Sequence, residues 1–284
     1  MGGSRWLFHF LLVFMLLHVV RSLESQTCHP TDLRALLDFS GGWDSKAAGL
    51  VGWGPGAAAA CCSWTGVACD LGRVVALDLS NRSLHGVISP AVASLDGLAA
   101  LNLSRNALRG AAPEALACLP MLRALDLSAN ALSGPFPAAG FPAIEDLNIS
   151  FNSFDGPHPA FPAAANLTAL DVSGNNFSGG INSSALCLSP LQVLRFSGNA
   201  LSGEIPSGLS RCRALTELSL DGNCFTGNVP GDLYTLPNLR RLSLQENQLT
   251  GNLGSGLGNL SFPDVFGEMR RPESINLATN RLDG

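Results

Sequence analysis

The sequence predicts an α/β solenoid, a fold in which short coils of similar sequence stack along one axis. Three observations predict it: a recurring phrase, its nearly constant spacing, and an alternation of apolar and polar residues within each copy. The phrase L-x-L-S-x-N-x-L-x-G, or a close variant, begins at positions 77, 101, 125, 147, 170, 194, 218, 242 and 275. Because one copy is too short to bury a core alone, the copies are expected to stabilise one another by stacking.

The spacing of the asparagines measures the length of one coil. Along the sequence, the successive steps are 24, 22, 23, 24, 24 and 24 between Asn106, Asn130, Asn152, Asn175, Asn199, Asn223 and Asn247. Within each copy the two L-x-L leucines point inward from a short strand, as alternate residues of a strand do. The asparagine is expected to satisfy backbone groups at the inward bend, and the glycine permits the tight return.

A second signature, G-x-[IVF]-P, follows several copies of the phrase. It occurs at 134–137, 203–206 and 227–230, and in a weaker form at 110–113. Together the two signatures, over residues 74–284, resemble the plant-specific class of leucine-rich repeat. The resemblance implies a second short strand and 3₁₀ turns on the convex side of a twisted superhelix of about nine repeats.

The segment 1–25 is interpreted as a secretory signal peptide. Arg5 precedes an apolar run from Trp6 to Val20, and the small residues Ser22 and Ser25 offer cleavage sites. The rival interpretation is a membrane anchor, but this run is shorter than the ~20 residues that a bilayer requires. We therefore expect the chain in the secretory pathway, either extracellular or on the extracellular side of the plasma membrane as part of a longer receptor.

An N-terminal cap is expected over residues 26–73. A helical stretch at 31–39, with Thr31 or Asp32 as helix N-cap, precedes the segment C-C-S-W-T-G-V-A-C at 61–69. With two nearby tryptophans, this arrangement resembles the cap of plant receptor-like leucine-rich repeat proteins, and the resemblance implies two disulfides. We favour Cys28–Cys61 and Cys62–Cys69, although other pairings are open and a zinc site is the rival interpretation.

Further modification sites are expected along the repeats. Cys187 and Cys212 lie one coil apart, so a disulfide between adjacent coils is open. N-x-[ST] acceptors for N-linked glycans occur at Asn81, Asn102, Asn148, Asn166, Asn176, Asn182 and Asn259. Asn102 and Asn148 stand between the inward leucines and are expected on the concave face, where a glycan would keep partners away.

The sequence predicts neither an enzyme nor a nucleic-acid-binding protein, and no cofactor or metal. H-R-D and D-F-G kinase motifs do not occur, and the only lysine, Lys46, lies in the cap. The glycine run at 254–258 lacks the lysine of a phosphate-binding loop, and His29, His85 and His158 stand on separate elements. A net charge of −5 with one lysine opposes phosphate-backbone contacts.

The concave face is therefore the candidate binding surface, for a peptide or protein ligand. Its side chains are small in the early coils and charged from the sixth copy onward. The candidate contact residues are Phe151, Arg195, Glu217, Asp221, Arg241, Gln245 and Glu246. The rival interpretation is a solvated ribbon whose charges serve solubility.

The cap, the phrase order and the stretches at 257–261 and 263–284 resemble the first third of phytosulfokine receptor kinases. In that family the resemblance implies an island domain for a tyrosine-sulfated peptide, a membrane helix, a cytoplasmic Ser/Thr kinase and a co-receptor kinase. Only the scaffold is carried by this chain, which we expect to belong to peptide-hormone signalling. The alternative is a secreted leucine-rich repeat protein similar to polygalacturonase inhibitors, acting in defence, and a weaker third idea is a decoy that binds co-receptors.

The C-terminal region departs from the repeat. The sequence step from Asn247 to Asn280 is 33, whereas two ordinary coils would give 2 × 24 = 48. The second of the two expected coils is therefore incomplete. We expect a partly deleted coil near residues 252–268, a last coil over 268–284 that packs poorly, and no C-terminal cap.

Overall fold

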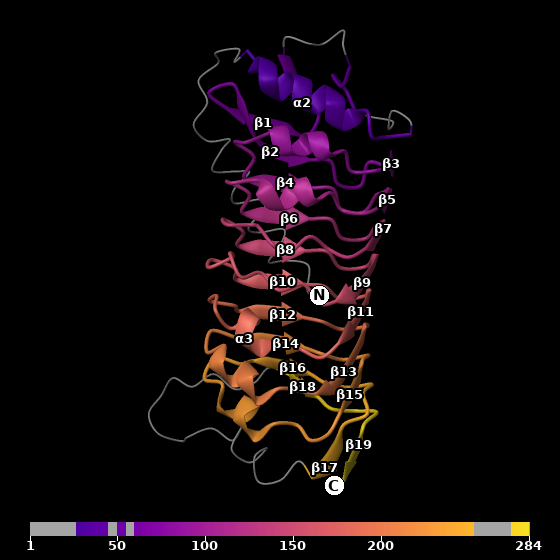
Figure 1. Cartoon of the computed structure of the whole chain (residues 1–284), viewed down its shortest axis with the longest axis vertical. Helices are drawn as coiled ribbons and strands as arrows, with labels where there is room; N and C mark the ends of the chain where they lie inside the picture. Colours follow the sequence, from indigo (N-terminus) through magenta and orange to yellow (C-terminus); the bar gives the residue numbers. More distant parts are fainter. Residues whose placement is uncertain (1–26, 45–49, 55–59, 253–273, 284) are drawn as a thin grey trace.

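The computed structural model describes residues 27–44, 50–54, 60–252 and 274–283. It is an elongated solenoid with its cap at one end (Figure 1). A ten-stranded sheet runs along it in the order β1 (Val67–Asp70), β2 (Arg73–Asp78), β4 (Ala100–Asn102), β6 (Ala124–Asp126), β8 (Asp146–Asn148), β10 (Ala169–Asp171), β12 (Val193–Arg195), β14 (Glu217–Ser219), β16 (Arg241–Ser243) and β18 (Ser274–Asn276). All neighbours pair in parallel except β1 and β2, which are antiparallel.

A second parallel sheet runs beside the first (Figure 1). It contains β3 (His85–Gly86), β5 (Ala107–Gly110), β7 (Ala131–Gly134), β9 (Ser153–Pro157), β11 (Asn176–Gly179), β13 (Ala200–Glu204) and β15 (Cys224–Thr226). A separate pair follows, β17 (Thr250–Asn252) with β19 (Arg281–Asp283). The return segments carry η2 (Pro90–Ser94), η3 (Glu114–Cys118), α3 (Ser183–Leu186), η4 (Ser207–Arg211) and η5 (Gly231–Thr235), where η denotes a 3₁₀ helix. The expected second strand and 3₁₀ turns are therefore confirmed.

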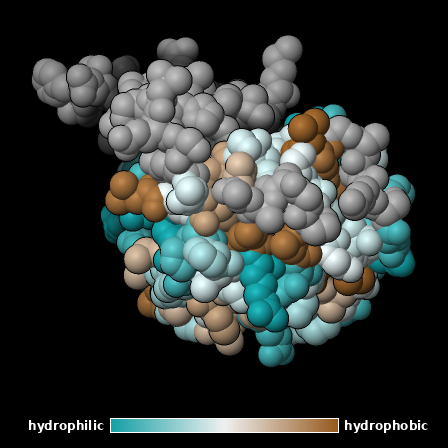
Figure 2. Space-filling view, turned by 90° about the horizontal axis from the view of Figure 1, so that it is seen from above, coloured by the Kyte–Doolittle hydropathy of each residue, from teal (hydrophilic) through white to brown (hydrophobic). Residues whose placement is uncertain are grey.

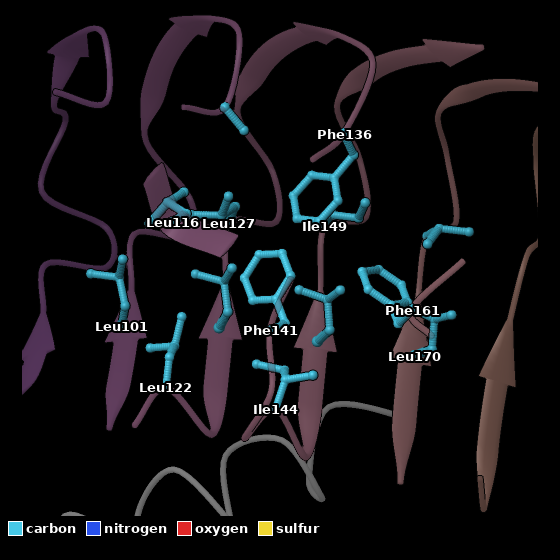
Figure 3. Close-up of a cluster of buried hydrophobic side chains, with 14 of the residues drawn as sticks. Leu101, Leu116, Leu122, Leu127, Phe136, Phe141, Ile144, Ile149, Phe161 and Leu170 are labelled. Atoms are coloured by element: carbon cyan, nitrogen blue, oxygen red, sulfur yellow. The ribbon is translucent and has the colours of Figure 1, made fainter. Parts of the chain in front are cut away.

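The core is one continuous apolar column between the sheets and the return segments. Figure 3 shows leucines from successive coils meeting phenylalanine rings in this column. Phe136 lies 5.8 Å from Phe141 and 5.5 Å from Phe154, measured between ring centroids. Each coil therefore buries its apolar residues against its two neighbours, which is why a single copy could not fold.

The repeat asparagines form a hydrogen-bonded ladder through the core. Asn175 is representative: its Nδ2 donates to the carbonyls of Ile149, Val172 and Ser173, and its Oδ1 accepts the backbone N–H of Phe154. These bonds join the asparagine's own coil to the preceding one. The predicted role of the asparagine is confirmed.

The cap helix α2 spans Pro30–Ser40, close to the predicted stretch, but its start differs from the prediction. The N-cap residue is His29, without a capping side-chain bond, so the expected Thr31 or Asp32 cap is wrong. Asp32 is instead fully buried and accepts from Arg73 Nε at 3.1 Å and from the Val74 backbone N–H at 2.7 Å. It lies in the first helical turn, where it ties α2 to β2 rather than capping α2.

Disulfides close the cap and join two coils. Cys28 pairs with Cys61 and Cys62 with Cys69, which is the favoured pairing, and these bonds use all four thiols that a zinc site would need. A third disulfide joins Cys187 to Cys212, linking the segments after α3 and η4. Figure 2 looks onto the capped end, where hydrophobic residues stand among hydrophilic ones. Leu36 and Phe39 of α2 are fully buried in the same core cluster as the repeat leucines, so the cap covers the apolar end of the column.

The described part of the last coil continues the ten-stranded sheet and the asparagine ladder. Strand β18 pairs directly with β16, and Asn280 continues the ladder by donating to the Leu244 carbonyl at 2.9 Å. Asn280 is therefore the rung of the ladder that follows Asn247, 33 residues further along the sequence. Ile275 and Leu277 are half-buried, whereas Leu244 is fully buried.

Several expectations fall outside the described residues. These are the signal peptide at 1–25, the deletion near 252–268, the Asn259 acceptor, and the packing of residues 268–273 and 284. Within the described ranges, no helix combines the length and hydrophobicity needed to cross a bilayer.

Candidate binding surface

The concave face consists of the side chains that point away from the core on the ten-stranded sheet. Strand pairing places equivalent residues of successive coils directly opposite one another, for example Leu194 beside Leu218 and Arg195 beside Ser219. When the same residue type recurs at one position of the repeat, its copies therefore lie side by side on adjacent strands and form a row across the sheet. Two rows and one network of charges define this face.

The first row alternates aspartate and asparagine along the N-terminal coils. Its members are Asp78, Asn102, Asp126, Asn148 and Asp171, in direct register. Each Oδ1 accepts the backbone N–H of the residue two positions later, at 2.9 to 3.0 Å. Burial raises the pKa of Asp126, the bonds from Ser128 oppose this, and the Asp171 and Asp78 carboxylates raise it further. The side chains of this row therefore accept hydrogen bonds from the backbone at the ends of their own strands. They leave few free acceptors for a ligand.

A network of four charges crosses β10, β12, β14 and β16. Arg195 contacts Glu217 through Nε at 2.5 Å and Nη2 at 3.1 Å, and it reaches Asp171 Oδ2 at 3.5 Å. Arg241 Nη1 lies 3.4 Å from Glu217 Oε2. Burial alone would raise the pKa of Glu217, but the Arg195 and Arg241 guanidinium groups outweigh it and hold that pKa below its ordinary value. The network is therefore stabilised by its own pairs.

The second row runs where each strand turns toward the asparagine ladder. In successive coils its members are Asn81, Arg105, Ala129, Phe151, Gly174, Gly198, Gly222, Glu246 and Thr279. All nine adopt left-handed backbone conformations, with φ between 54° and 64°. We call the three glycines the glycine row. They leave three successive coils without a side chain at this position, between an aromatic ring and a carboxylate, and Gly198 is the exposed one of the three.

The two residues that flank the glycine row, Phe151 and Glu246, are exposed and differ in chemistry. The Phe151 side chain is 66% exposed, the largest exposure of an aromatic residue among the described large hydrophobics. Its ring covers Gly174, because a Cβ built there would lie 2.8 Å from Phe151 Cδ1. Glu246 extends toward Gly222, with Oε2 3.9 Å from the equivalent point. Gly198 lies open between them, since a Cβ there would meet only Gly174 backbone at 3.6 Å.

The predicted contact residues all lie on this face, but they fall into three groups with different surroundings. It brings Arg195, Glu217 and Arg241 into one network, and places Phe151 and Glu246 at opposite ends of the glycine row. Asp221 accepts from Ser197 Oγ at 2.7 Å, and Gln245 accepts from Ser243 Oγ at 2.8 Å. Sequence reasoning missed Asp171 and the three glycines. The signal for the glycines was the S-G-N or D-G-N variant of the phrase in three successive copies.

The predicted glycan acceptors also divide. Asn81, Asn166, Asn176 and Asn182 are exposed, Asn102 is half-buried and Asn148 is buried.

A separate hollow of about 620 Å³ lies beside the ends of β13 and β15, lined by Glu204, Ile205, Pro206, Ser207, Gly227, Asn228 and Pro230. Glu204 is its sole charged lining residue, and Ser207 and Asn228 are its polar uncharged side chains.

Comparison with known families agrees with this architecture. The leucine rich repeat N-terminal domain matches residues 29–70. Leucine rich repeat models match residues 73–132, 166–188, 190–212, 214–236 and 238–260, together more than half of the chain. Phytosulfokine receptor 1 of Arabidopsis thaliana is 41% identical over 81 residues, which are 26% of this chain and 8% of the receptor. The match thus spans a small part of that relative's length.

Solved structures extend the comparison to most of the chain. The ectodomain of the plant membrane receptor kinase GASSHO1/SCHENGEN3 from Arabidopsis thaliana, in complex with CASPARIAN STRIP INTEGRITY FACTOR 2, aligns with a TM-score of 0.80 and 32% identity, covering 88% of this chain and 30% of that one. The Arabidopsis receptor kinase HAESA, in complex with the peptide hormone IDA and the co-receptor SERK1, gives 0.70 and 29%, covering 89% and 46%. A plant ice-binding protein gives 0.65 and 25%, covering 90% and 88%.

These matches and the observed fold agree on the same assignment. The chain belongs to the leucine-rich repeat proteins and resembles the N-terminal ectodomain part of plant leucine-rich repeat receptor kinases.

Proposed function

We propose that this chain is the N-terminal scaffold of an extracellular receptor of the phytosulfokine-receptor type, acting in peptide-hormone signalling on the extracellular side of the plasma membrane. The resemblance to phytosulfokine receptor 1 supports the type, and the solved peptide-bound ectodomains support the class of ligand. The scaffold itself performs no catalysis. A peptide or protein ligand and a co-receptor kinase ectodomain are its proposed partners.

The observation that carries the ligand proposal is the glycine row between Phe151 and Glu246. Three glycines without side chains let an extended peptide approach backbone groups closely, which any Cβ-bearing residue would hinder. The exposed Phe151 ring supplies an apolar anchor of the kind enriched at interface hot spots, and Glu246 supplies a charge for a basic group. The neighbouring network keeps Arg195 and Glu217 in fixed positions.

The test uses the residue that can be changed without clashes. Gly198→Glu places a side chain in the middle of the row, and the chain already holds glutamate in the same conformation at Glu246. The matched control is Gly156→Glu, a left-handed glycine in the second sheet at which a Cβ would meet nothing within 4 Å. Peptides selected from a displayed random library on the wild-type chain are then measured against both variants.

We expect Gly198→Glu to weaken the selected peptides at least tenfold and Gly156→Glu to leave them unchanged. Equal binding by both variants would remove the glycine row as the ligand site. Circular dichroism and elution volume of each variant show that the loss does not come from unfolding. Retention of a SERK1 ectodomain by the purified chain, with and without a selected peptide, tests the co-receptor separately.

A second candidate is a self-standing secreted leucine-rich repeat protein. The observation that favours it is the plant ice-binding protein, because the alignment covers 88% of that chain. The exposed side of the second sheet carries small polar residues on successive strands, including Ser133, Ser153, Ser178, Ser202 and Thr226. Inhibition of ice recrystallisation by the purified chain would support this candidate, and inhibition of a fungal polygalacturonase would support the defence alternative.

A further inference from the structure

The glycan acceptors within the described residues differ in what their side chains do in the folded protein. Asn148 lies in β8 and is 9% exposed. Its Oδ1 accepts two bonds from its own acceptor motif, from Ser150 N at 3.0 Å and from Ser150 Oγ at 2.7 Å. Those two bonds fix the plane of the amide, so its Nδ2 cannot turn freely toward solvent.

Asn148 is also enclosed by its neighbours on the sheet. It pairs in register with Asp126 on β6 and Asp171 on β10, and adjacent strands lie only ~4.8 Å apart. A sugar ring on Nδ2 would have to stand between these two side chains or displace them. Asn102 repeats the arrangement, with bonds from Ser104 N and Oγ and with Asp78 and Asp126 as neighbours.

The four exposed acceptors have no such enclosure. Asn81 occupies a left-handed turn beside the concave face, at the same position of its coil as Phe151. Asn176 begins β11, where it alternates with the fully buried Phe177 and therefore points outward from the second sheet. Asn182 precedes α3 and Asn166 precedes β10, both with exposed side chains. Asn182 Oδ1 also accepts a bond from the serine of its own motif, Ser184 Oγ at 2.7 Å, but Asn182 is not on a strand and has no carboxylates beside it in register.

We infer that N-linked glycans occupy Asn81, Asn166, Asn176 and Asn182 in the folded protein, and that Asn102 and Asn148 carry none because they are structural members of the aspartate–asparagine row. Three of the occupied sites, at 166, 176 and 182, belong to one coil. Their glycans surround the flank and back of that coil. The concave face from β4 to β16 stays free of sugar.

This distribution has consequences for both candidate functions, although it depends on neither. A bare concave face leaves the glycine row accessible to a ligand. A glycan on Asn176 interrupts the outer side of the second sheet near its middle, between β9 and β13. A flat ligand lattice could not then lie across that side, so glycosylated protein should lack any ice-binding activity that depends on it.

Glycopeptide mass spectrometry of the full chain, secreted from plant cells and purified as a single folded species, tests the inference. Digestion with peptide N-glycosidase A in heavy-oxygen water marks each asparagine that carried a glycan. We expect marks at Asn81, Asn166, Asn176 and Asn182. A mark at Asn102 or Asn148 in the folded species, or an unmarked member of the exposed four, would overturn it.

A matched pair of serine variants also tests which asparagines carry glycans, and it leaves every asparagine in place. Ser178→Ala and Ser150→Ala each remove the hydroxyl that an acceptor motif requires, at Asn176 and at Asn148 respectively. Ser178→Ala should lower the mass of the secreted protein by one glycan. Ser150→Ala should leave the glycan mass unchanged, and a loss of one glycan from that variant would contradict the inference even if its stability falls.

Discussion

Replacing Asn223 with alanine should show how much one rung of the asparagine ladder stabilises the solenoid. The Asn223 side chain makes four bonds: Nδ2 donates to the carbonyls of Phe196, Leu220 and Asp221 at 2.9, 3.0 and 3.1 Å, and Oδ1 accepts from Leu201 N at 3.1 Å. The cost depends on which of these backbone groups keep another partner.

The three carbonyls keep a partner because neighbouring rungs share them. Phe196 O also accepts from Asn199, Leu220 O from Asn247, and Asp221 O from the backbone N–H of Gly198. The Leu201 N–H loses the acceptor that Asn223 supplies. Counting about 2 kcal/mol for the buried donor and about 0.5–1 kcal/mol for each of the three weakened carbonyls, the expected loss of unfolding free energy is about 3.5–5 kcal/mol.

Equilibrium unfolding in guanidinium chloride, under oxidising conditions, measures this loss. The control is Asn238→Ala, which removes one exposed bond to the Arg213 carbonyl and should cost about 0.5 kcal/mol. Asn223→Asp keeps the acceptor but directs a carboxylate at three carbonyls, so at neutral pH it should destabilise more than alanine does. An alanine variant no less stable than the Asn238 control, or an aspartate variant milder than alanine, would refute the reasoning.

For three further substitutions the structure predicts whether the stability of the protein rises or falls. Asp32→Ala should lower the unfolding free energy by about 2–4 kcal/mol, because the buried Val74 N–H loses its acceptor and Arg73 keeps only Asp96 as a carboxylate partner. Asp38→Asn, in an exposed pair, should cost under about 0.5 kcal/mol, and thermal denaturation separates the two variants. Asp126→Asn, prepared without glycosylation because it creates an acceptor motif, should raise the unfolding free energy at pH 7. That gain should vanish as the pH falls below 3.8, since the raised pKa of Asp126 makes its ionised form unfavourable in the fold. Burial lowers the pKa of His158, so stability should fall as the pH drops below the ordinary value of 6.5, and His158→Gln should flatten that part of a pH titration of the melting temperature.

The fold was predictable because the spacing of the repeat gives the length of one coil and the positions that face inward. Each inward leucine and each asparagine recurs at the coil spacing, so one copy interpreted correctly gives all nine. The start of α2 was not predictable in the same way, because it occurs once. Asp32 looks like a helix cap from its local sequence, and only Arg73 and Val74, far along the chain, reveal that it is a buried link.

The binding surface was predictable as a set of residues but not as an arrangement. Alternation along the strands places Arg195 and Glu217 outward, and a parallel register makes them neighbours. Sequence cannot show that they satisfy each other, because that depends on side-chain conformations across strands. The glycine row was overlooked for another reason: a residue without a side chain becomes a feature only when its counterparts on adjacent coils are also glycine.

The difference between the charge network and the glycine row decides where ligand affinity should arise. Arg195 and Glu217 are 19% and 13% exposed and already paired, so a charged ligand that engaged either one would have to replace a short, half-buried contact. Such an exchange gives little net free energy, because the lost pair offsets the new one. Phe151 and Glu246 face solvent beside bare backbone, and no interaction has to break before a ligand contacts them. The network is therefore a support that holds β12 and β14 in register, and selectivity for a ligand should lie with Phe151, Gly198 and Glu246.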